Sequence, residues 1–380
     1  MEWKEYSLGD VCSRLSSGKN IKASEVHNNG LYPVFGGNGI RGFTDKQNFN
    51  GECAVIGRQG AYCGNVRYFN GVAYMTEHAL VLQGNEKSET QFLAYLLSIM
   101  DLGRLSGQSA QPGLSVKTLK IQKVSLPNLS DQRKIAGILS ALDAKIENNN
   151  KINANLEAQA QALFKSWFVD FTPFKDQPFV DSELGPIPQG WKVGKLGDYC
   201  ETICRGLTPK YNLDSKEIVL GQTCVRNNIV TLNNARKHQP KGKTEKKVQQ
   251  WDTLINSTGI GSLGRVGIVY FDYNYVSFDS HITVVRATNP LLRPYIGRNL
   301  VSRQLEIENL AIGSTGQTEL PRESVKSITL YIPTQKVLES FNCIIKPLSL
   351  KILKNIQENQ RLAALRDTLL PKLMSGEIKL

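Results

Sequence analysis

The sequence predicts an α+β protein in which two similar globular units are separated by an antiparallel pair of long helices, with an internal pseudo-two-fold repeat. Three observations support this class. The opening of the chain recurs in its middle, β-rich runs follow each copy of that opening, and a long stretch of helical periodicity closes each copy. At 380 residues the chain is also long enough for more than one hydrophobic core.

The repeated opening is residues 3–18, WKEYSLGDVCSRLSSG, which align without a gap with residues 191–206, WKVGKLGDYCETICRG. The copies share Trp, Lys, Leu, Gly, Asp, Cys and the final Gly, whereas random pairing at ordinary composition gives roughly one match. Further along, residues 107–127 align with residues 313–333 at a larger offset, so the second copy carries longer loops. The chain therefore encodes one kind of unit twice.

Each globular unit is predicted to consist mainly of short strands separated by glycine-rich turns. A short amphipathic helix is expected to follow the strands, at residues 90–100 in the first unit and 291–307 in the second. The matched β-rich runs are residues 52–58, 64–69 and 79–83 in the first unit and residues 252–258, 264–271 and 281–287 in the second.

A long helix is predicted after each unit, because apolar residues recur mostly at three- and four-residue steps from Ile135 to Trp167 and from Ile344 to Leu373. Each helix could run about 38 residues, or roughly 57 Å, and the obvious packing partner of each is its own copy. The copies are identical at Ile138, Lys145, Ile146, Asn149, Asn153, Leu156, Ala158 and Leu163, each matched 206 residues later.

Three residues of these helices carry specific expectations. Pro347 should either kink the second helix or divide it into a short helix and a longer one. Asn149 and Asn355 lie near the apolar seams, where a polar residue can fix the register of a helix pair. The alternative is that both asparagines face water, and the sequence favours neither arrangement.

Prolines at 173, 178, 186 and 188 indicate an extended connector between the first long helix and the second copy of the opening. The chain is accordingly divided into four predicted segments. These are a first globular unit at 1–128, a central helical region at 129–171, the connector with a second globular unit at 172–333, and a C-terminal helical region at 334–380.

The net charge of +12 and the sequence pI near 9.3 favour a polyanionic partner. The charged opening and the lack of a run of about 18 apolar residues predict a cytoplasmic location without a membrane partner. No CxxC motif occurs among the seven cysteines and no metal-ligand spacing among the histidines, so no metal site is expected.

No catalytic signature is found, and the chain is predicted to be a non-enzymatic protein without catalytic residues or a cofactor. Two stretches match the dinucleotide fingerprint GxGxxG, at residues 37–42 and 259–264, but strand-like residues rather than a helix follow each. We interpret both as turns. His78 and His281 precede equivalent predicted strands, which indicates a shared structural role.

Basic and amide residues on the glycine-rich loops are the candidates for contact with a polyanion. Arginine binds guanine edges, asparagine and glutamine bind adenine, and lysine clusters mainly bind phosphate. For any single residue the alternative is a solvated surface side chain, whereas the set as a whole favours DNA. The candidate DNA-binding residues are Asn38, Arg41, Arg58, Gln59, Tyr62, Lys241, Lys243, Ser257, Arg265 and Gln317.

Several segments resemble the specificity subunit of type I restriction-modification systems. They are YPVFGGNGIRGFTD, GRQGAYCGNV, GQSAQPGLSVKTLK, LPNLSDQRKI and LRDTLLPKLMSGEI. The resemblance covers almost the whole chain and is weaker in residues 207–250. The second copy also departs from the first where Thr318 and Glu319 replace Pro112 and Gly113.

The resemblance implies a non-catalytic subunit with two target-recognition domains, each reading one half of a bipartite double-stranded DNA site. It also implies that the helices dock two modification subunits, which bring S-adenosylmethionine and methylate adenine, and that restriction or translocase subunits can join. Two other functions remain as alternatives. A helical scaffold that joins two proteins without reading DNA would bind duplexes weakly and independently of salt, and a nucleotide-dependent enzyme would retain its cofactor.

Overall fold

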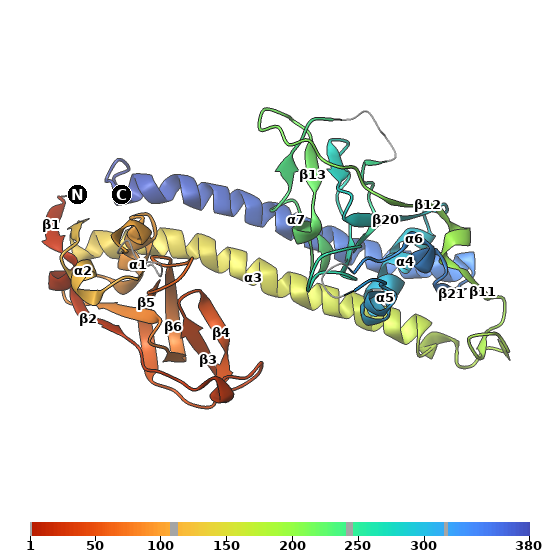
Figure 1. Ribbon diagram of the computed structural model, residues 1–380, viewed down its shortest axis with the longest axis horizontal. Helices are drawn as coiled ribbons and strands as arrows, with labels where there is room; N and C mark the ends of the chain where they lie inside the picture. The colour runs from red at the N-terminus through yellow and green to blue at the C-terminus, as the bar shows by residue number, and fades with distance from the viewer. Residues whose placement is uncertain (1, 107–112, 241–245, 315–317) are drawn as a thin grey trace. The chain divides into compact units, whose positions relative to one another are not determined.

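The computed structural model describes residues 2–106, 113–240, 246–314 and 318–380, and its contacts divide the chain into two compact units (Figure 1). Unit 1 comprises residues 1–147 and 359–380, and unit 2 comprises residues 148–358. Each of the two long helices, α3 (Leu129–Phe168) and α7 (Gln335–Met374), contributes part of its length to each unit. Sheets and helices are combined in both units, so the predicted α+β class is confirmed.

Unit 1 is built on a six-stranded sheet in the order β2–β7–β5–β6–β3–β4. Neighbouring strands are antiparallel, except that β3 runs parallel to β6. Residues 53–57 of the central strand β5 are all buried, as expected for a strand covered on both faces. The strands are β2 (Cys12–Ser17), β3 (Tyr32–Gly36), β4 (Gly39–Thr44), β5 (Phe49–Gly57), β6 (Val66–Met75) and β7 (Ala79–Gly84).

The predicted amphipathic helix of unit 1 is confirmed as α1 (Thr90–Ser98). The carboxylate of Glu89 caps it by accepting from the backbone N–H of Gln91 at 3.0 Å. Its buried face, which includes Phe92 and Leu96, belongs to the core that also contains residues of β5 and β7. A separate ribbon pairs β1 (Lys4–Ser7) with β8 (Lys123–Leu126), and the short helix α2 (Val116–Lys120) precedes β8.

Unit 2 also has a six-stranded sheet, in the order β12–β20–β17–β18–β15–β14. Its first four strands correspond, in that order, to β2, β7, β5 and β6 of unit 1. The predicted second helix of 291–307 is two helices, α4 (Leu292–Ser302) and α5 (Gln304–Asn309). The ribbon is repeated as well, since β11 (Lys192–Lys195) pairs antiparallel with β21 (Thr329–Ile332) after the short helix α6 (Arg322–Lys326). The sheet strands are β12 (Cys200–Arg205), β14 (Val225–Arg226), β15 (Asn228–Val230), β17 (Thr253–Asn256), β18 (Val266–Ile268) and β20 (Ile282–Ala287).

The two units differ where β6 is a single long strand in unit 1. Its second half corresponds in unit 2 to β19 (Val276–Phe278), which pairs parallel with β13 (Ile218–Leu220) as β6 does with β3. The strand β16 (Arg236–Lys237) then pairs antiparallel with β13, as β4 does with β3. The hairpin β14–β15 has no counterpart among the described strands of unit 1. The sequence divergence in residues 207–250 therefore coincides with an added hairpin.

The last glycine of the repeated opening is required in both units because the backbone of another segment approaches it closely. A Cβ at Gly18 would lie 2.1 Å from the carbonyl oxygen of Met75, and a Cβ at Gly206 would lie 2.0 Å from that of Phe278. In each unit the glycine that directly follows the strand of the opening, β2 or β12, passes against the backbone at Met75–Thr76 or at Phe278–Asp279. Only glycine allows this approach, which explains an identity of the repeat.

Helices α3 and α7 pair antiparallel within each unit. In unit 1, Arg366 of α7 donates to Asp143 of α3 at 2.6 Å. In unit 2, Asn355 donates to Asn153 at 2.8 Å. Asn149 donates to a carboxylate oxygen of α7, and both Asn149 and Asn355 are 1% exposed. Of the two arrangements left open for these asparagines, the one inside the helix pair is confirmed.

Pro347 does not divide the second long helix, and the predicted short helix followed by a longer one is wrong. Residues 335–374 form a single α-helix through the proline. Proline removes only one backbone donor, and the exposed ring lies on the outer side of the helix. Burial of Ile345 and Ile352 on the inner side holds both flanking turns in place.

The predicted extended connector contains a short 3-10 turn, Thr172–Phe174, and a two-stranded ribbon of β9 (Phe179–Val180) and β10 (Ile187–Pro188). Phe174 and Ile187 are buried in the core of unit 2, so the connector packs rather than hangs free. Among the described residues, no helix combines the length and the apolarity needed to cross a membrane.

Candidate nucleic-acid interface

One end of the unit 1 sheet carries a junction of loops held by backbone hydrogen bonds. The N–H of Arg58, directly after β5, donates to the carbonyl of His78 at 2.9 Å, and its own carbonyl accepts from the N–H of Leu114 at 2.8 Å. The β5–β6 loop is closed at its base, because the N–H of Gly57 donates to Asn65 at 2.8 Å. We call residues 57–65, 76–78 and Leu114 the unit 1 junction.

The same hydrogen bonds recur in unit 2. Ser257 follows β17, donates from its N–H to the carbonyl of His281 at 2.8 Å, and accepts from the N–H of Leu320 at 2.8 Å. The N–H of Asn256 donates to Arg265 at 2.9 Å and closes the β17–β18 loop. We call residues 256–265, 279–281 and Leu320 the unit 2 junction. Arg58 and Ser257 are equivalent in backbone position.

A histidine side chain holds the loop of each junction to the strand that follows. The Nδ1 atom of His78 lies 3.0 Å from Oε1 of Gln59, and that of His281 lies 2.8 Å from the hydroxyl of Thr258. In unit 2 the backbone N–H of His281 also donates to Asp279 at 2.9 Å, and burial raises the pKa of that carboxyl group. The predicted shared structural role of the two histidines is confirmed.

Both fingerprint-like glycine stretches form turns, as predicted. The first two residues of GNGIRG, Gly37 and Asn38, make the turn between β3 and β4, and the other four begin β4, whereas GIGSLG lies in the β17–β18 loop. Gly64 and Gly264 end the two equivalent loops with φ angles of 88° and 79°. A Cβ there would lie 2.3 Å from the backbone of Gly103 and 2.8 Å from that of Glu308, respectively. Each loop therefore returns to its sheet through a left-handed glycine.

The structure exposes most of the predicted contact residues of unit 1. Asn38 and Arg41 lie on the β3–β4 hairpin, and Gln59 and Tyr62 lie on the β5–β6 loop, all with exposed side chains. Arg58 is half-buried, and its guanidinium donates to the carbonyl of Glu77 at 3.3 Å. Gly37, at the base of the hairpin, would place a Cβ 3.1 Å from the carbonyl of Gln59, so the two loops adjoin.

The predicted residues of unit 2 are less uniform. Arg265 is half-buried, and its guanidinium donates to the carbonyl of Gly261 at 2.6 Å. Ser257 is fully buried and its hydroxyl lies 2.6 Å from that of Thr283, so its side chain does not reach the surface. The expectation that Ser257 touches DNA is corrected accordingly. Lys241, Lys243 and Gln317 lie outside the described residues.

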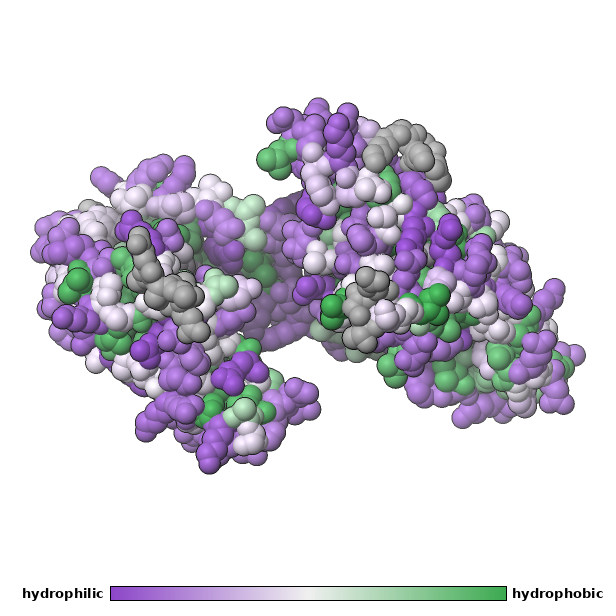
Figure 2. Space-filling model, viewed as in Figure 1, coloured by the Kyte–Doolittle hydropathy of each residue, from purple (hydrophilic) through white to green (hydrophobic). Residues whose placement is uncertain are grey.

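Two exposed isoleucines at the loop tips escaped the sequence analysis. Ile40 is 57% exposed on the β3–β4 hairpin, and Ile260 is 91% exposed on the β17–β18 loop. Hydrophilic residues dominate the visible face of both units (Figure 2). Each isoleucine adjoins a glycine in a turn, which is the signal that could have identified them. An apolar tip can contact the methyl group of thymine.

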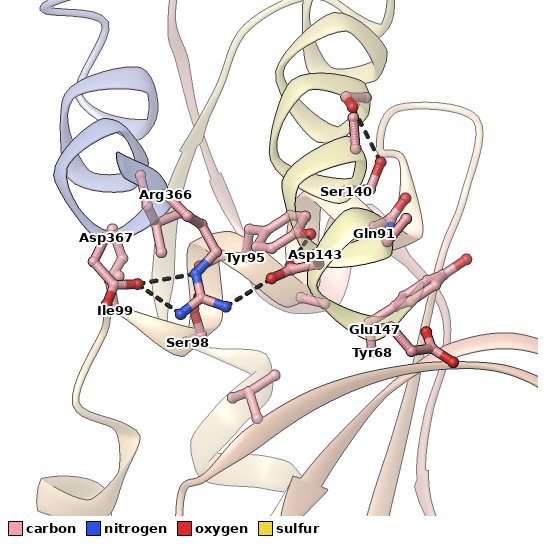
Figure 3. Close-up of a pocket in the computed structure, with 16 residues that line it drawn as sticks. Tyr68, Gln91, Tyr95, Ser98, Ile99, Ser140, Asp143, Glu147, Arg366 and Asp367 are labelled. Atoms are coloured by element: carbon pink, nitrogen blue, oxygen red, sulfur yellow. Dashed lines mark hydrogen bonds and ion pairs between the residues drawn. The ribbon is translucent and has the colours of Figure 1, made fainter. Parts of the chain in front are cut away.

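A second surface feature of unit 1 is a cleft of about 830 Å³ between α1, β6 and the portions of α3 and α7 that belong to this unit. Arg366 lies between Asp143 and Asp367, and Tyr95 donates to Asp143 at 2.6 Å (Figure 3). Burial, and then the hydrogen bond to Asp143, raise the pKa of Tyr95. This network ties α1 and α7 to α3. The described residues contain no group of His, Cys, Asp and Glu side chains that could hold a metal.

Comparison with known proteins gives a consistent set of similarities. The model of the type I restriction modification DNA specificity domain matches residues 1–158 and 188–360. The type I restriction enzyme MjaIX specificity subunit of Methanocaldococcus jannaschii is 29% identical over 307 residues, covering 76% of this chain and 69% of that protein. The EcoprrI specificity subunit of Escherichia coli is 37% identical over 147 residues, covering 38% of this chain and 36% of that protein.

A solved structure supports the fold. The crystal structure of the S subunit of a type I restriction-modification system from M. genitalium matches with a TM-score of 0.62 at 18% identity, covering 98% of this chain and 96% of that one.

Proposed function

Because the chain belongs to the type I restriction-modification DNA specificity family, as a non-catalytic specificity subunit, we propose that each of its units reads one half of a bipartite double-stranded DNA target. The observation that carries this proposal is the pair of junctions. The same backbone hydrogen bonds present loops of different sequence in the two units. Two units that share one backbone scaffold but carry different loop side chains can bind a DNA target whose two halves differ in sequence.

The chemistry of the loops supports contact with base edges. Unit 1 presents Asn38, Arg41, Gln59 and Tyr62 on two adjoining loops, and these side chains supply the donors and acceptors that distinguish base pairs in the major groove. Arg58 is placed at the base of the same loops. We assign the recognition segments to residues 1–128 and 172–333, and we assign Lys241 and Lys243 to phosphate contact.

We further propose that the helical regions dock two modification subunits, which supply S-adenosylmethionine and methylate adenine, and that restriction or translocase subunits join this complex. Ile138 of α3 and Ile344 of α7 support two equivalent docking sites. They are identical residues at equivalent positions of the repeat, and they are 38% and 43% exposed. An exposed isoleucine retained in both copies has no use in its own unit's core.

Sequencing of methylated bases tests the reading of DNA. The chain is co-expressed with its modification subunit, and methylated adenines are located by single-molecule sequencing. A split, asymmetric motif with adenine methylated in both halves is the expected result, and its spacer length follows directly. An assembled complex that is supplied with S-adenosylmethionine and methylates no defined motif would contradict the proposal and favour the scaffold alternative.

Substitution of the equivalent isoleucines tests docking. Ile138→Asp and Ile344→Asp should each remove one modification subunit from the complex, and the double variant should remove both, because a carboxylate cannot be buried in an apolar contact. Native mass spectrometry counts the subunits. Leu305→Asp is the matched control, since Leu305 is 73% exposed on α5 rather than on a long helix. Retention of both subunits by the double variant would rule out these docking sites.

A further inference from the structure

The added hairpin of unit 2 borders a polar cleft that adjoins the unit 2 junction. The cleft has a volume of about 340 Å³ and is lined by Arg226, Asn227, Asn228, Arg265, Val266 and Gln304. Arg265 belongs both to this lining and to the closing hydrogen bond of the β17–β18 loop. We call it the Arg226 cleft. No described strand of unit 1 corresponds to the hairpin that forms its wall.

The side chains of the Arg226 cleft present hydrogen-bond donors. The guanidinium of Arg226 is exposed and forms no ion pair or side-chain hydrogen bond with any residue that the structure describes. Gln304 uses its Oε1 atom to accept from the N–H of Val266 at 3.2 Å, which leaves its amide N–H groups as the donors. Neither aspartate nor glutamate is part of the lining. Two arginines without a lining carboxylate make a site for an anion.

The backbone of the hairpin fixes the amide side chains of the cleft. Asn227 and Asn228 have φ angles of 52° and 64°, in the left-handed region that asparagine tolerates better than most residues. Left-handed conformations at successive positions match the tight hairpin between β14 and β15. The two amides are therefore presented by a turn rather than by a long flexible side chain.

Shape decides which part of DNA suits this site. Base edges are recessed in the grooves and are reached by protruding groups, such as the β17–β18 loop whose tip, Ile260, is 91% exposed. Phosphates project from the duplex and fit concave sites lined by donors. We propose that the Arg226 cleft binds a backbone phosphate of the DNA half-site that unit 2 reads, and that unit 1 holds its half-site without an equivalent contact. This inference rests on the proposed function.

Salt-dependent DNA binding tests the inference. Full-length chain in complex with its modification subunits is titrated with a duplex carrying the motif found by methylation sequencing and with a scrambled duplex of equal length. Arg226→Ala should weaken binding to both duplexes by a similar factor, roughly five- to tenfold near 0.1 M salt. The slope of log affinity against log salt should fall by about 0.9, the value for one lost phosphate contact.

Two further variants give the test its specificity. Lys192→Ala removes the same charge from β11 and should leave the slope unchanged, because Lys192 lies in the separate β11–β21 ribbon. Arg226→Lys should restore most of the slope, since it keeps the charge, and only part of the affinity, since it lacks the planar fork.

The outcomes separate the inference from the proposed function. Wild-type complex that binds both duplexes equally would overturn the reading of DNA itself. If wild-type complex prefers the motif and Arg226→Ala binds as wild type does, the phosphate site is overturned alone. Loss of discrimination at one base pair without a change of salt slope would also overturn it, because Arg226 would then contact a base edge.

Discussion

Arg58 in unit 1 and Ser257 in unit 2 occupy the same place in the backbone but not the same place relative to the surface. Both donate to the carbonyl of a histidine and accept from the N–H of a leucine. Arg58 is half-buried beside exposed loop residues, whereas Ser257 is 0% exposed and bonded to Thr283. Equivalence in the scaffold therefore does not carry over to the side chains that meet the target. The contact residues of each unit have to be found separately.

The units also differ in how each is fixed to the long helices. In unit 2, Arg298 of α4 is 0% exposed and donates to Glu157 of α3 at 2.5 Å, and a second donor of the guanidinium reaches the hydroxyl of Tyr270. In unit 1 the link comes from Tyr95 of α1, whose hydroxyl donates to Asp143 of α3. Asp143 also pairs with Arg366 of α7, and the side chains of that ion pair, Arg366 and Asp143, are 30% and 36% exposed. A buried network fixes one unit and a solvated network fixes the other.

The largest expected effect comes from replacing the glycine that ends the repeated opening in each unit. Gly206→Ala should destabilise unit 2 by more than about 4 kcal/mol, because its Cβ would lie 2.0 Å from a backbone carbonyl oxygen. Gly18→Ala should do the same to unit 1. Hydrogen exchange resolved by unit measures each loss.

Gly137→Ala is the control for the glycine variants. A Cβ at Gly137 meets nothing within 4 Å in the interior of helix α3, so this variant should be stabilised by about 0.5–1 kcal/mol. Equal losses in both units from either single variant at Gly18 or Gly206 would contradict the assignment of each glycine to its own unit.

Removing the charged links should affect the units unequally. Arg298→Met leaves Glu157 buried without its cation and should cost about 3–5 kcal/mol of unfolding free energy, whereas Arg366→Met should cost about 1 kcal/mol because its pair is solvated. Chemical denaturation followed by unit-resolved hydrogen exchange compares the two. The double variant Arg298→Met/Glu157→Gln should recover part of the lost unfolding free energy. If it recovers none, the cause of the loss is not electrostatic.

Substitution at the equivalent backbone position should separate recognition from stability. Arg58→Ala should reduce discrimination at one base pair of the motif by about 1–3 kcal/mol if its guanidinium meets a base edge. Ser257→Ala should leave discrimination unchanged and cost about 1 kcal/mol of stability, because Thr283 loses its partner. Competition binding against single-base variants of the motif gives both results. A uniform loss over all sequences would make Arg58 a phosphate contact.

The smallest expected effect concerns the histidines that hold the loops. His78→Ala and His281→Ala should each lower discrimination by less than about 1 kcal/mol, since one side-chain hydrogen bond to the loop is lost in each. The effect of each variant should be confined to one half of the motif, and the two halves should differ. Methylation sequencing of both variants is the measurement. If both variants change the same half of the motif, the assignment of one junction to each half-site is wrong.

The sequence predicted the elements of this fold better than the surroundings of particular side chains. Strand runs, helices and glycine turns were correct because periodicity and turn chemistry depend on local sequence. The expected division of the second long helix at Pro347 was wrong because burial of the neighbouring residues outweighs the loss of one backbone donor. Burial of Ser257 was missed because serine is common both on surfaces and in satisfied hydrogen bonds.

The Arg226 cleft could not have been predicted from local pattern. Its residues come from the β14–β15 hairpin, the end of the β17–β18 loop and α5, and only the sheet order brings them together. The equivalence of Arg58 with Ser257 was also hidden, since the two side chains have nothing in common and the alignment of the copies changes its offset between these regions. Tertiary contacts, not residue types, identify both features.

The junctions have a consequence for how such a protein changes over generations. Their principal hydrogen bonds use backbone N–H and carbonyl groups, so the fold of each loop depends on its left-handed glycines and its histidine contact more than on its exposed side chains. Under the proposed function, a substitution at an exposed loop residue such as Tyr62, which is 49% exposed, can therefore alter the DNA target at little expense of folding free energy. New target preferences can arise by single substitutions in one half while the ancestral preference of the other half is inherited intact.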